Sequence, residues 1–401
     1  MAQTLAKPQN EGVRLRQIGT LICIVATAGA VAILALVAAA LIGRGVTVGT
    51  LWPTYGPGIV LLALAFLACT LVLRPISSLG PFAPLTAGAA TIGALLIVAA
   101  IQSAVLRAGG SLAPQLGLSL EPIALGAPDQ RQTIVTPDGA RLTESIYRPA
   151  GGYRTPTPML VYVHGGGWTG GTADGNAHDL RWFADHGWLV ISLDYRLASA
   201  TQPTWNTATS DVLCGLNWAA ANADRLGGDR SRIALIGDSA GGTLALTASY
   251  AAAGGRRLSA CSSPPPRVGA VVAGSPLIDL AYSYEHGQPS GEIAPKTFIA
   301  QYLGGPPAQH ADRVAAVAPA TWLGADVPPT LLIVPARDAL VPPEGDDAFM
   351  ARAGTVEGTV QRVDIPFAGH VFYHRAAGSM GNYGYLTIIA RYLKDRGLAP
   401  H

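Results

Sequence analysis

The chain has 401 residues, of which 49% are hydrophobic and only 13% charged, and its formal net charge is +2. So small a charge, with no basic stripe along the chain, argues against a nucleic-acid partner. The length exceeds that of one average domain. The charged residues are also unevenly placed, because nearly all of them lie beyond Arg107.

The N-terminal part of the chain is predicted to cross a membrane three times. Apolar runs cover about residues 18–42, 57–73 and 82–105, and a helix needs about 20 such residues to cross a bilayer. None of the three runs has a polar face, which a soluble helix would show. We therefore expect a short tail over residues 1–16 and a transmembrane region over residues 17–107.

The Lys and Arg residues beside the three runs predict the orientation of the chain. Those on the N-terminal side of the membrane outnumber those on the other side: Lys7, Arg14, Arg16 and Arg74 against Arg44 and Arg107. Positive charges favour the cytoplasmic side. The sequence thus predicts an integral plasma-membrane protein with a cytoplasmic N-terminus and an extracytoplasmic C-terminal part.

Four cysteines are divided between these two parts of the chain. Cys23 and Cys69 lie inside the predicted spans and are interpreted as small apolar packing residues. Cys214 and Cys261 belong to the C-terminal part, where an oxidising compartment allows a disulfide. The pairing stays open, because Cys214 is expected near the start of a helix and Cys261 in a loop.

Residues 108–129 are predicted to form a linker or part of a cap, and residues 130–401 an α/β domain. Strands are expected at 132–135, 142–147, 159–163, 188–193, 233–236, 268–273, 330–334 and 360–365, and helices at about 176–186, 207–223, 243–252 and 381–393. Continuous apolar strands that alternate with helices predict a mostly parallel sheet covered on both faces. A long insertion at about 276–328 is expected to be a lid.

The sequence Gly237-Asp238-Ser239-Ala240-Gly241 follows the apolar strand at 233–236 and fits the pattern Gly-x-Ser-x-Gly. A strand that turns sharply into a helix needs small residues beside the serine, and it presents the serine hydroxyl at the end of the sheet. Ser239 is therefore the candidate nucleophile.

A nucleophilic serine needs a histidine base and a carboxylate that orients the histidine. His370 follows the strand at 360–365, and Asp338 follows the strand at 330–334. Their order after Ser239 is the one expected for this pattern. Asp346 and Asp347 are substitutes for Asp338, but we expect both to face solvent from the next helix.

An oxyanion needs N–H donors that are already in position. Gly165, Gly166 and Gly167 follow the strand at 159–163, and Ala240 follows the serine, so the backbones of these four residues are candidates for the oxyanion hole. His374 follows His370 at the spacing of a zinc-binding pair, but the glutamate of the His-Glu-x-x-His pattern is absent. We expect neither a metal nor a cofactor.

Three segments resemble the α/β-hydrolase superfamily, and most closely its hormone-sensitive-lipase-type carboxylesterases. They are His-Gly-Gly-Gly-Trp at 164–168, Asp-Tyr-Arg-Leu at 194–197 and Gly-Asp-Ser-Ala-Gly-Gly at 237–242. The resemblance covers about residues 130–398 and implies an α/β-hydrolase fold. Two segments depart from the family pattern: Ala-Ser-Ala at 198–200, and Asp-Ala-Leu-Val-Pro at 338–342, which is closer to other esterases and to peptidases.

By this resemblance, Ser239 is the nucleophile, His370 the base and Asp338 its partner. The resemblance implies that the oxyanion donors are Gly166, Gly167 and Ala240, that Gly165 shapes the turn, and that His164 and Trp168 are structural.

The sequence as a whole predicts a membrane-anchored serine carboxylesterase that cleaves small-molecule or lipid acyl esters through an acyl-enzyme. Deacetylation, acyl transfer and peptide cleavage need the same triad and stay open as alternatives. A hydrolase-like binding module without activity is an alternative of a different class.

Overall fold

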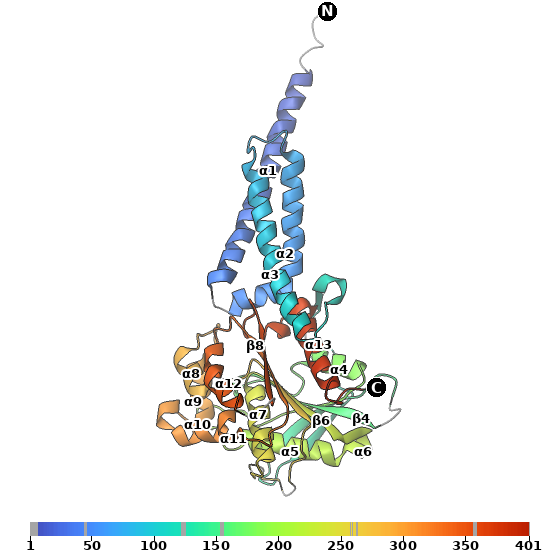
Figure 1. Ribbon diagram of the computed structural model, residues 1–401, viewed down its shortest axis with the longest axis vertical. Helices are drawn as coiled ribbons and strands as arrows, with labels where there is room; N and C mark the ends of the chain where they lie inside the picture. Colours follow the sequence, from blue (N-terminus) through green and yellow to red (C-terminus); the bar gives the residue numbers. More distant parts are fainter. Residues whose placement is uncertain are drawn as a thin grey trace, which may run out of the picture.

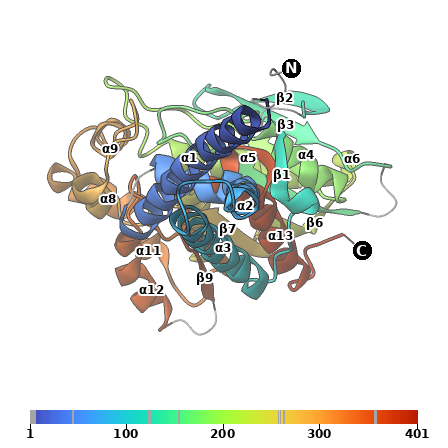
Figure 2. The same ribbon diagram turned by 90° about the horizontal axis from the view of Figure 1, so that it is seen from above.

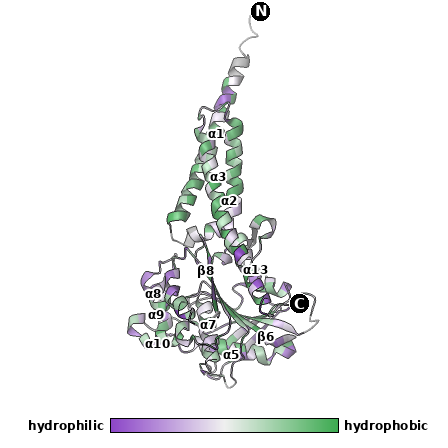
Figure 3. Ribbon diagram, viewed as in Figure 1, coloured by the Kyte–Doolittle hydropathy of each residue, from purple (hydrophilic) through white to green (hydrophobic). Residues whose placement is uncertain are grey.

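A computed structural model describes residues 7–43, 46–121, 126–152, 156–256, 258, 260–261, 264–355 and 359–400. The chain forms a stalk of three long helices that stands on an α/β domain, with the N-terminus at the far end of the stalk (Figure 1). Seen from above, the stalk lies over the middle of that domain (Figure 2). Apolar residues cover the three helices along most of their length (Figure 3).

The stalk consists of α1 (Lys7–Ile42), α2 (Val46–Leu73) and α3 (Phe82–Arg107). The segments Gly12–Ile42, Gly49–Leu73 and Phe82–Arg107 are long and apolar enough to cross a membrane. Large apolar side chains project from all three helices, as lipid contact requires: Leu21, Leu62 and Leu96 are each at least 49% exposed.

The second helix begins earlier than the expected start near residue 57. α2 begins at Val46 and contains both Pro53 and Pro57. A proline inside a helix removes one donor and leaves a carbonyl without its intrahelical partner. Here Thr50, Trp52 and Thr54 of α2 are buried at the base of the stalk, and Trp52 packs in a core shared with the α/β domain, so the free energy of this packing offsets the cost of the prolines.

The α/β domain has an eight-stranded sheet in the order β2-β3-β5-β4-β6-β7-β8-β9. β2, β3 and β5 pair antiparallel, and all the other pairs are parallel. The strands are β2 (Gln130–Val135), β3 (Arg141–Tyr147), β4 (Thr157–Val163), β5 (Leu189–Leu193), β6 (Gly228–Asp238), β7 (Ala270–Gly274), β8 (Thr330–Pro335) and β9 (Val360–Ile365). The predicted strands and the mostly parallel sheet are confirmed.

Two cores lie on opposite faces of this sheet, because side chains alternate along each strand. Met159, Val161 and Val163 of β4 pack with helices α5 (Ala208–Ala221), α6 (Ala223–Leu226), α7 (Ala240–Ala253) and α12 (Asp347–Ala353). Leu160 and Tyr162 face the other way, toward α4 (Ala177–Asp185) and α13 (Met380–Lys394).

The core on the α13 face continues into the base of the stalk. Trp52 of α2 and Val105 of α3 belong to the same buried cluster as Phe372 and Met380. The approach is close, because a Cβ atom at Gly384 of α13 would lie 2.8 Å from a methyl carbon of Val105. The stalk and the α/β domain are therefore packed as one body.

The described part of residues 108–129 lies against this same face of the sheet. The 3-10 turn η1 (Pro114–Gly117) leads into β1 (Leu118–Glu121), which pairs antiparallel with β10 (Ala377–Ser379) just before α13. The described residues thus connect the stalk to the α/β domain beside α13, and the prediction of a linker or cap at 108–129 stays a prediction.

The insertion between β7 and β8 carries its own short helices. They are α8 (Leu280–His286), α9 (Pro295–Leu303), the 3-10 turn η2 (Pro307–Gln309), α10 (Ala311–Val317) and α11 (Pro319–Trp322). They lie together at one side of the α/β domain (Figure 1).

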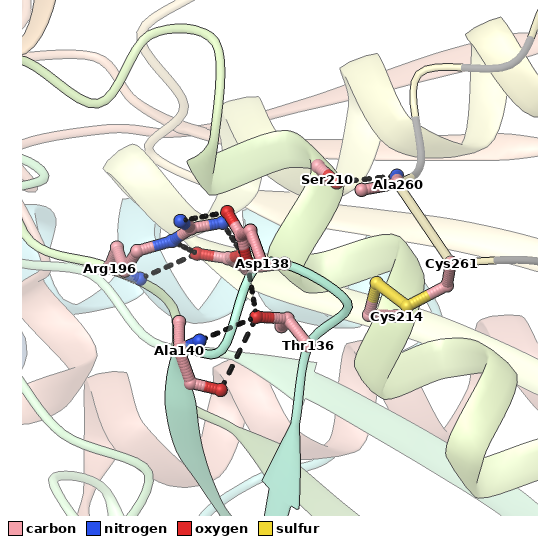
Figure 4. The surroundings of a disulfide bond; sticks show 9 residues. Thr136, Asp138, Ala140, Arg196, Ser210, Cys214, Ala260 and Cys261 are labelled. Carbon is pink, nitrogen blue, oxygen red and sulfur yellow. Dashed lines mark hydrogen bonds and ion pairs between the residues drawn. A yellow bond between two sulfur atoms is a disulfide. The ribbon is translucent and has the colours of Figure 1, made fainter.

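A disulfide joins Cys214 and Cys261, the pair that the sequence left open (Figure 4). Their Cα atoms are 5.6 Å apart, so the bond ties α5 to the segment after α7. The backbone N–H of Ala260 also donates to Ser210 Oγ at 2.9 Å, which fixes the same segment on α5.

Candidate active site

Ser239 is the single residue between the end of β6 and the start of α7, and its backbone is strained, with φ = 53°. Its backbone N–H donates to the Gly274 carbonyl at 2.7 Å. The flanking glycines leave no room for side chains. A Cβ atom at Gly237 would lie 2.3 Å from the Gly241 oxygen, and one at Gly241 would lie 2.2 Å from the Val163 oxygen.

Ser239, His370 and Asp338 lie in one continuous line of contacts. His370 Nε2 is 3.0 Å from Ser239 Oγ, and His370 Nδ1 is 2.7 Å from Asp338 Oδ2. The other carboxylate oxygen, Oδ1, accepts N–H groups from Leu340 and Val341, both at 2.9 Å. Because the carboxylate accepts a hydrogen bond from Nδ1–H, the lone pair of Nε2 faces the serine hydroxyl.

The substitutes considered for Asp338 lie elsewhere, and one of them is not where we expected it. Asp347 is exposed, but Asp346 is buried and ends the 3-10 turn η3 (Pro343–Asp346). Burial raises the pKa of Asp346 to about 7, although the nearby Arg362 opposes the shift. The expectation that Asp346 faces solvent is wrong, because η3 turns its carboxyl inward.

The turn after β4 formed by Gly165, Gly166 and Gly167, here called the glycine corner, lies beside Ser239. A Cβ atom at Gly165 would be 3.3 Å from Ser239 Cβ, and Gly166 has φ = 121° with the Gly170 oxygen only 2.2 Å from where its Cβ would be. Within the residues described, the backbone N–H groups of Gly166, Gly167 and Ala240 donate to no protein atom. These three donors are therefore available to a ligand at Ser239.

Two aromatic contacts support the glycine corner from behind. The ring of His164 stacks on Tyr195 with centroids 4.4 Å apart, and Tyr195 Oη donates to the His164 carbonyl at 3.0 Å. Burial lowers the pKa of His164, so its ring is neutral. Trp168 stacks on Tyr302 of α9 at 4.2 Å.

The segment after β5, which contains Ala-Ser-Ala at 198–200, holds the glycine corner in place. The N–H of Ala198 donates to the Trp168 carbonyl at 2.7 Å. Arg196 makes two side-chain hydrogen bonds to the buried Asp211, at 2.8 and 2.6 Å, and one to Asp138 at 2.6 Å (Figure 4). This bidentate pairing of the Arg196 guanidinium with the Asp211 carboxylate fixes the segment on α5.

A cavity of about 470 Å³ opens at Ser239. Its walls are the glycine corner, His370 and apolar residues that include Ile293, Phe298 and Leu340. Ile293 and Phe298 come from the insertion between β7 and β8, so this insertion forms one side of the cavity. The volume lies in the range of small-molecule sites.

The sequence reasoning missed a buried polar cluster around Asp238. Its carboxylate accepts the hydroxyls of Tyr162 at 2.5 Å, Tyr373 at 3.0 Å and Tyr385. His374 Nε2 lies 3.1 Å from the same carboxylate. Burial alone would raise the pKa of Asp238, but the His374 charge and the donated hydrogen bonds bring it below its usual value.

Comparisons with known proteins agree with this architecture. Esterase LipC of Mycobacterium tuberculosis is 29% identical over 247 residues, which are 61% of this chain and 60% of LipC. Carboxylesterase NlhH of the same species is 42% identical over 96 residues, which are 23% of this chain and 28% of NlhH. The chain thus spans three-fifths or less of the length of these curated relatives.

Solved esterase structures share the fold. Esterase 2 of Thermogutta terrifontis, solved with propionate bound, has a TM-score of 0.57 at 22% identity and is matched over 98% of its length and 70% of this chain. Esterase LipW of Mycobacterium marinum has a TM-score of 0.53 at 23% identity, over 86% of its length and 75% of this chain. With the mostly parallel sheet, these matches identify the α/β-hydrolase fold.

The family model described as BD-FAE matches residues 145–352. This range contains the glycine corner, Ser239 and Asp338, and it ends before His370. Since it includes more than half of the 401 residues, the chain belongs to the BD-FAE family.

Proposed function

We propose that the protein is a carboxylic ester hydrolase with Ser239 as nucleophile, His370 as base and Asp338 as the group that orients the base. The observation that carries this proposal is the line of contacts from Ser239 Oγ through the His370 ring to Asp338, at 3.0 and 2.7 Å, at the end of a mostly apolar cavity. The names of the relatives, which are esterases and carboxylesterases, support it.

The reaction proceeds in two steps. In the first, Ser239 Oγ attacks the acyl carbonyl while His370 Nε2 takes the hydroxyl proton. The N–H groups of Gly166, Gly167 and Ala240 stabilise the oxyanion, and Gly165 shapes the turn that presents them. Collapse of this intermediate breaks the ester C–O bond, and the alcohol leaves with the proton from His370.

In the second step, water attacks the acyl group that is now esterified to Ser239. His370 takes a proton from this water, and the new oxyanion uses the same three donors. When the intermediate collapses, Ser239 regains its proton from His370 and the carboxylic acid leaves. The chain's own groups supply all of the acid–base chemistry, so this mechanism needs no cofactor.

The substrate class that fits the cavity is a small-molecule or lipid acyl ester. The apolar side chains of Ile293, Phe298 and Leu340 suit an acyl chain. The helices of the insertion at 276–328 act as a lid over this acyl site. A series of p-nitrophenyl esters of increasing chain length measures the preference.

We also propose that α1–α3 anchor the enzyme in the plasma membrane with the hydrolase on the extracytoplasmic side. Their length and exposed apolar side chains support the anchoring. The disulfide between Cys214 and Cys261 suits an oxidising compartment. Protease added to intact cells should digest the α/β domain but leave an N-terminal epitope intact, and protection of the domain would contradict this orientation.

The catalytic proposal is tested with the full chain in detergent. Ser239→Ala should lower turnover of p-nitrophenyl butyrate by about 10⁴-fold or more and abolish labelling by a fluorophosphonate. The control is Ser249→Ala, which removes a buried serine further along α7 and should keep both. Normal turnover by Ser239→Ala would exclude the proposal, and peptide or acetylated-glycan substrates assayed in parallel separate ester hydrolysis from the other acyl chemistries.

A further inference from the structure

We propose that the base of the stalk is part of the catalytic scaffold and that Gly49 of α2 is a positioning residue for His370. The proposal rests on the proposed function. It says that the helices α1 and α2 hold the loops of the proposed base and its carboxylate partner, and so do more than anchor the enzyme.

The first contact joins α2 to the loop of His370. The N–H of Gly369, the residue before His370, donates to the Gly49 carbonyl at 2.7 Å. A Cβ atom at Gly49 would lie 2.4 Å from Gly369 Cα and 2.5 Å from its nitrogen, closer than real Cβ atoms come to any neighbour. Only a glycine at position 49 allows the helix to approach this loop.

Pro53 explains why the Gly49 carbonyl is available. In an α-helix, the carbonyl of residue 49 would accept the N–H of residue 53. Position 53 is a proline inside α2 and has no N–H group. The acceptor that Pro53 leaves without an intrahelical partner is the one that Gly369 uses.

The second contact joins α1 to the loop of Asp338. Arg337 Nη2 donates at 3.0 Å to the carbonyl of Leu41, in the last turn of α1, where carbonyls have no partner within the helix. The backbone N–H of Arg337 also donates to the Ala368 carbonyl at 2.8 Å. The two loops are thus joined to each other, and each is joined to the stalk.

The loop of His370 needs such support because its backbone is strained. Phe367 and Val371, on either side of Gly369, have φ angles of 59° and 45°. Side chains rarely adopt this region, and a β-branched valine does so at a particular cost. Without the contact to Gly49, we expect the loop to relax and move the His370 imidazole away from Ser239 Oγ.

The experiment uses four variants of the full chain in detergent, arranged as two matched pairs. Gly49→Ala introduces the clash, and its control Gly58→Ala makes the same change in the same helix, where the new Cβ meets only a Leu118 methyl carbon at 3.8 Å. Pro53→Ala restores an N–H that competes for the Gly49 carbonyl, and its control is Pro57→Ala.

Three quantities are measured with water-soluble p-nitrophenyl acetate. A fluorophosphonate counts the reactive serines, so that kcat is expressed per competent site. KM and the pH dependence of kcat are recorded beside it, with the thermal unfolding midpoint. A purely structural role for Gly49 would lower the midpoint and the number of sites, but it would leave kcat per site and the pH profile unchanged.

Gly49→Ala should lower kcat per site by roughly tenfold to a hundredfold, since a displacement of about 1 Å can cost 10²-fold. Its KM should not change, and the acid limb of its pH profile should move because the Asp338–His370 contact is altered. Pro53→Ala should shift the same quantities less. Both controls should match the wild type.

The inference is overturned if Gly49→Ala and Pro53→Ala keep the wild-type kcat per site, or if the controls lose as much as they do. Should Gly49→Ala fail to fold, Arg337→Met tests the second contact instead, because it removes the side-chain donor to the Leu41 carbonyl. A lowered kcat per site then supports the inference, and an unchanged one refutes it. A wild-type chain that hydrolyses no ester and binds no fluorophosphonate would refute the proposed function, and this inference with it.

Discussion

His374 Nε2 forms an ion pair at 3.1 Å with the buried carboxylate of Asp238, the residue before the proposed nucleophile. Two buried charges stabilise a fold only when they are well paired. Asp238 ends β6, and His374 ends the 3-10 turn η4 (Phe372–His374) that follows His370. The pair therefore joins the strand that carries the serine to the segment that carries the base.

The first prediction concerns the pH dependence of this ion pair. Burial alone would lower the pKa of His374, but Asp238, and then Asp179, raise it above its usual value against the opposing charge of Arg375. A histidine with a raised pKa in the folded state stabilises the protein fully below its unfolded value of about 6.5. This stabilisation is lost as the pH rises through the folded pKa.

His374→Gln should therefore lower the free energy of unfolding by about 3 kcal/mol at pH 6, and by less at pH 9. Chemical unfolding in detergent at both pH values measures the difference. His186→Gln, at an exposed position on the surface, should have little effect at either pH. If the free energies of unfolding of the wild type and His374→Gln differ by the same amount at pH 6 and at pH 9, the prediction is wrong.

The second prediction concerns Asp338→Asn. Because Asp338 Oδ1 accepts two backbone N–H groups, the amide oxygen of the new side chain should keep that place and the amide NH₂ should face His370 Nδ1. The imidazole then carries its proton on Nε2 and cannot accept one from Ser239. We expect kcat to fall on the order of 10³-fold or more, with KM unchanged and the unfolding midpoint close to that of the wild type. A variant that kept the wild-type kcat and lost activity only through a raised KM would contradict this prediction.

The third prediction concerns Glu144, a fully buried carboxyl in β3 whose two oxygens have no hydrogen-bond partner among the described residues. Burial, and then the charge of Asp194, raises its pKa well above the usual value. The folded protein holds this acid neutral while the unfolded chain ionises it above about pH 4.3. Stability should thus fall by about 1.4 kcal/mol for each pH unit between the unfolded and the folded pKa.

Methionine has a volume similar to that of glutamate and no acidic group, so the Glu144→Met variant should be more stable than the wild type. Its gain in the free energy of unfolding should increase between pH 5 and pH 8. Glu144→Gln keeps the shape and a polar amide, and it separates the effect of charge from that of polarity. Unfolding curves for the three proteins across this pH range provide the measurement. A gain that does not depend on pH would show that ionisation plays no part.

The fourth prediction concerns the disulfide. It closes a loop over a sequence separation of 47 residues, and its removal in a Cys214→Ala, Cys261→Ala double variant should cost about 3 kcal/mol of stability. Thiol titration of the unfolded, unreduced wild type should find only the free Cys23 and Cys69. Activity per site should be unchanged, because neither half-cystine lines the cavity at Ser239. Four reactive thiols in the unreduced protein would rule the bond out.

The α/β fold could be predicted because its central strands contain short, continuous apolar runs. The segment at 159–163 has no polar residue besides the Tyr162 hydroxyl, and the structure buries it from both faces of the sheet. Placing Ser239, Asp338 and His370 after strands of one parallel sheet was enough to expect them at one edge, since the carboxyl ends of parallel strands meet there.

Other features depend on partners far away in the chain, so sequence alone did not reveal them. Pro53 and Pro57 argue against a helix before residue 58, yet α2 begins at Val46 because the α/β domain packs against its first turns. The tyrosines around Asp238 come from β4, η4 and α13. The sequence around Asp346 predicts a surface residue, but the 3-10 turn η3 directs its carboxyl into the protein.

The core shared by Trp52, Val105, Phe372 and Met380 has a consequence for the fate of the protein in the cell. A protease that cuts between α3 and β2 would not shed a soluble enzyme into the surroundings. The severed α/β domain would stay bound to the three helices through this shared apolar core. Under the membrane anchoring proposed above, the proposed activity would therefore stay at the membrane even after such a cut.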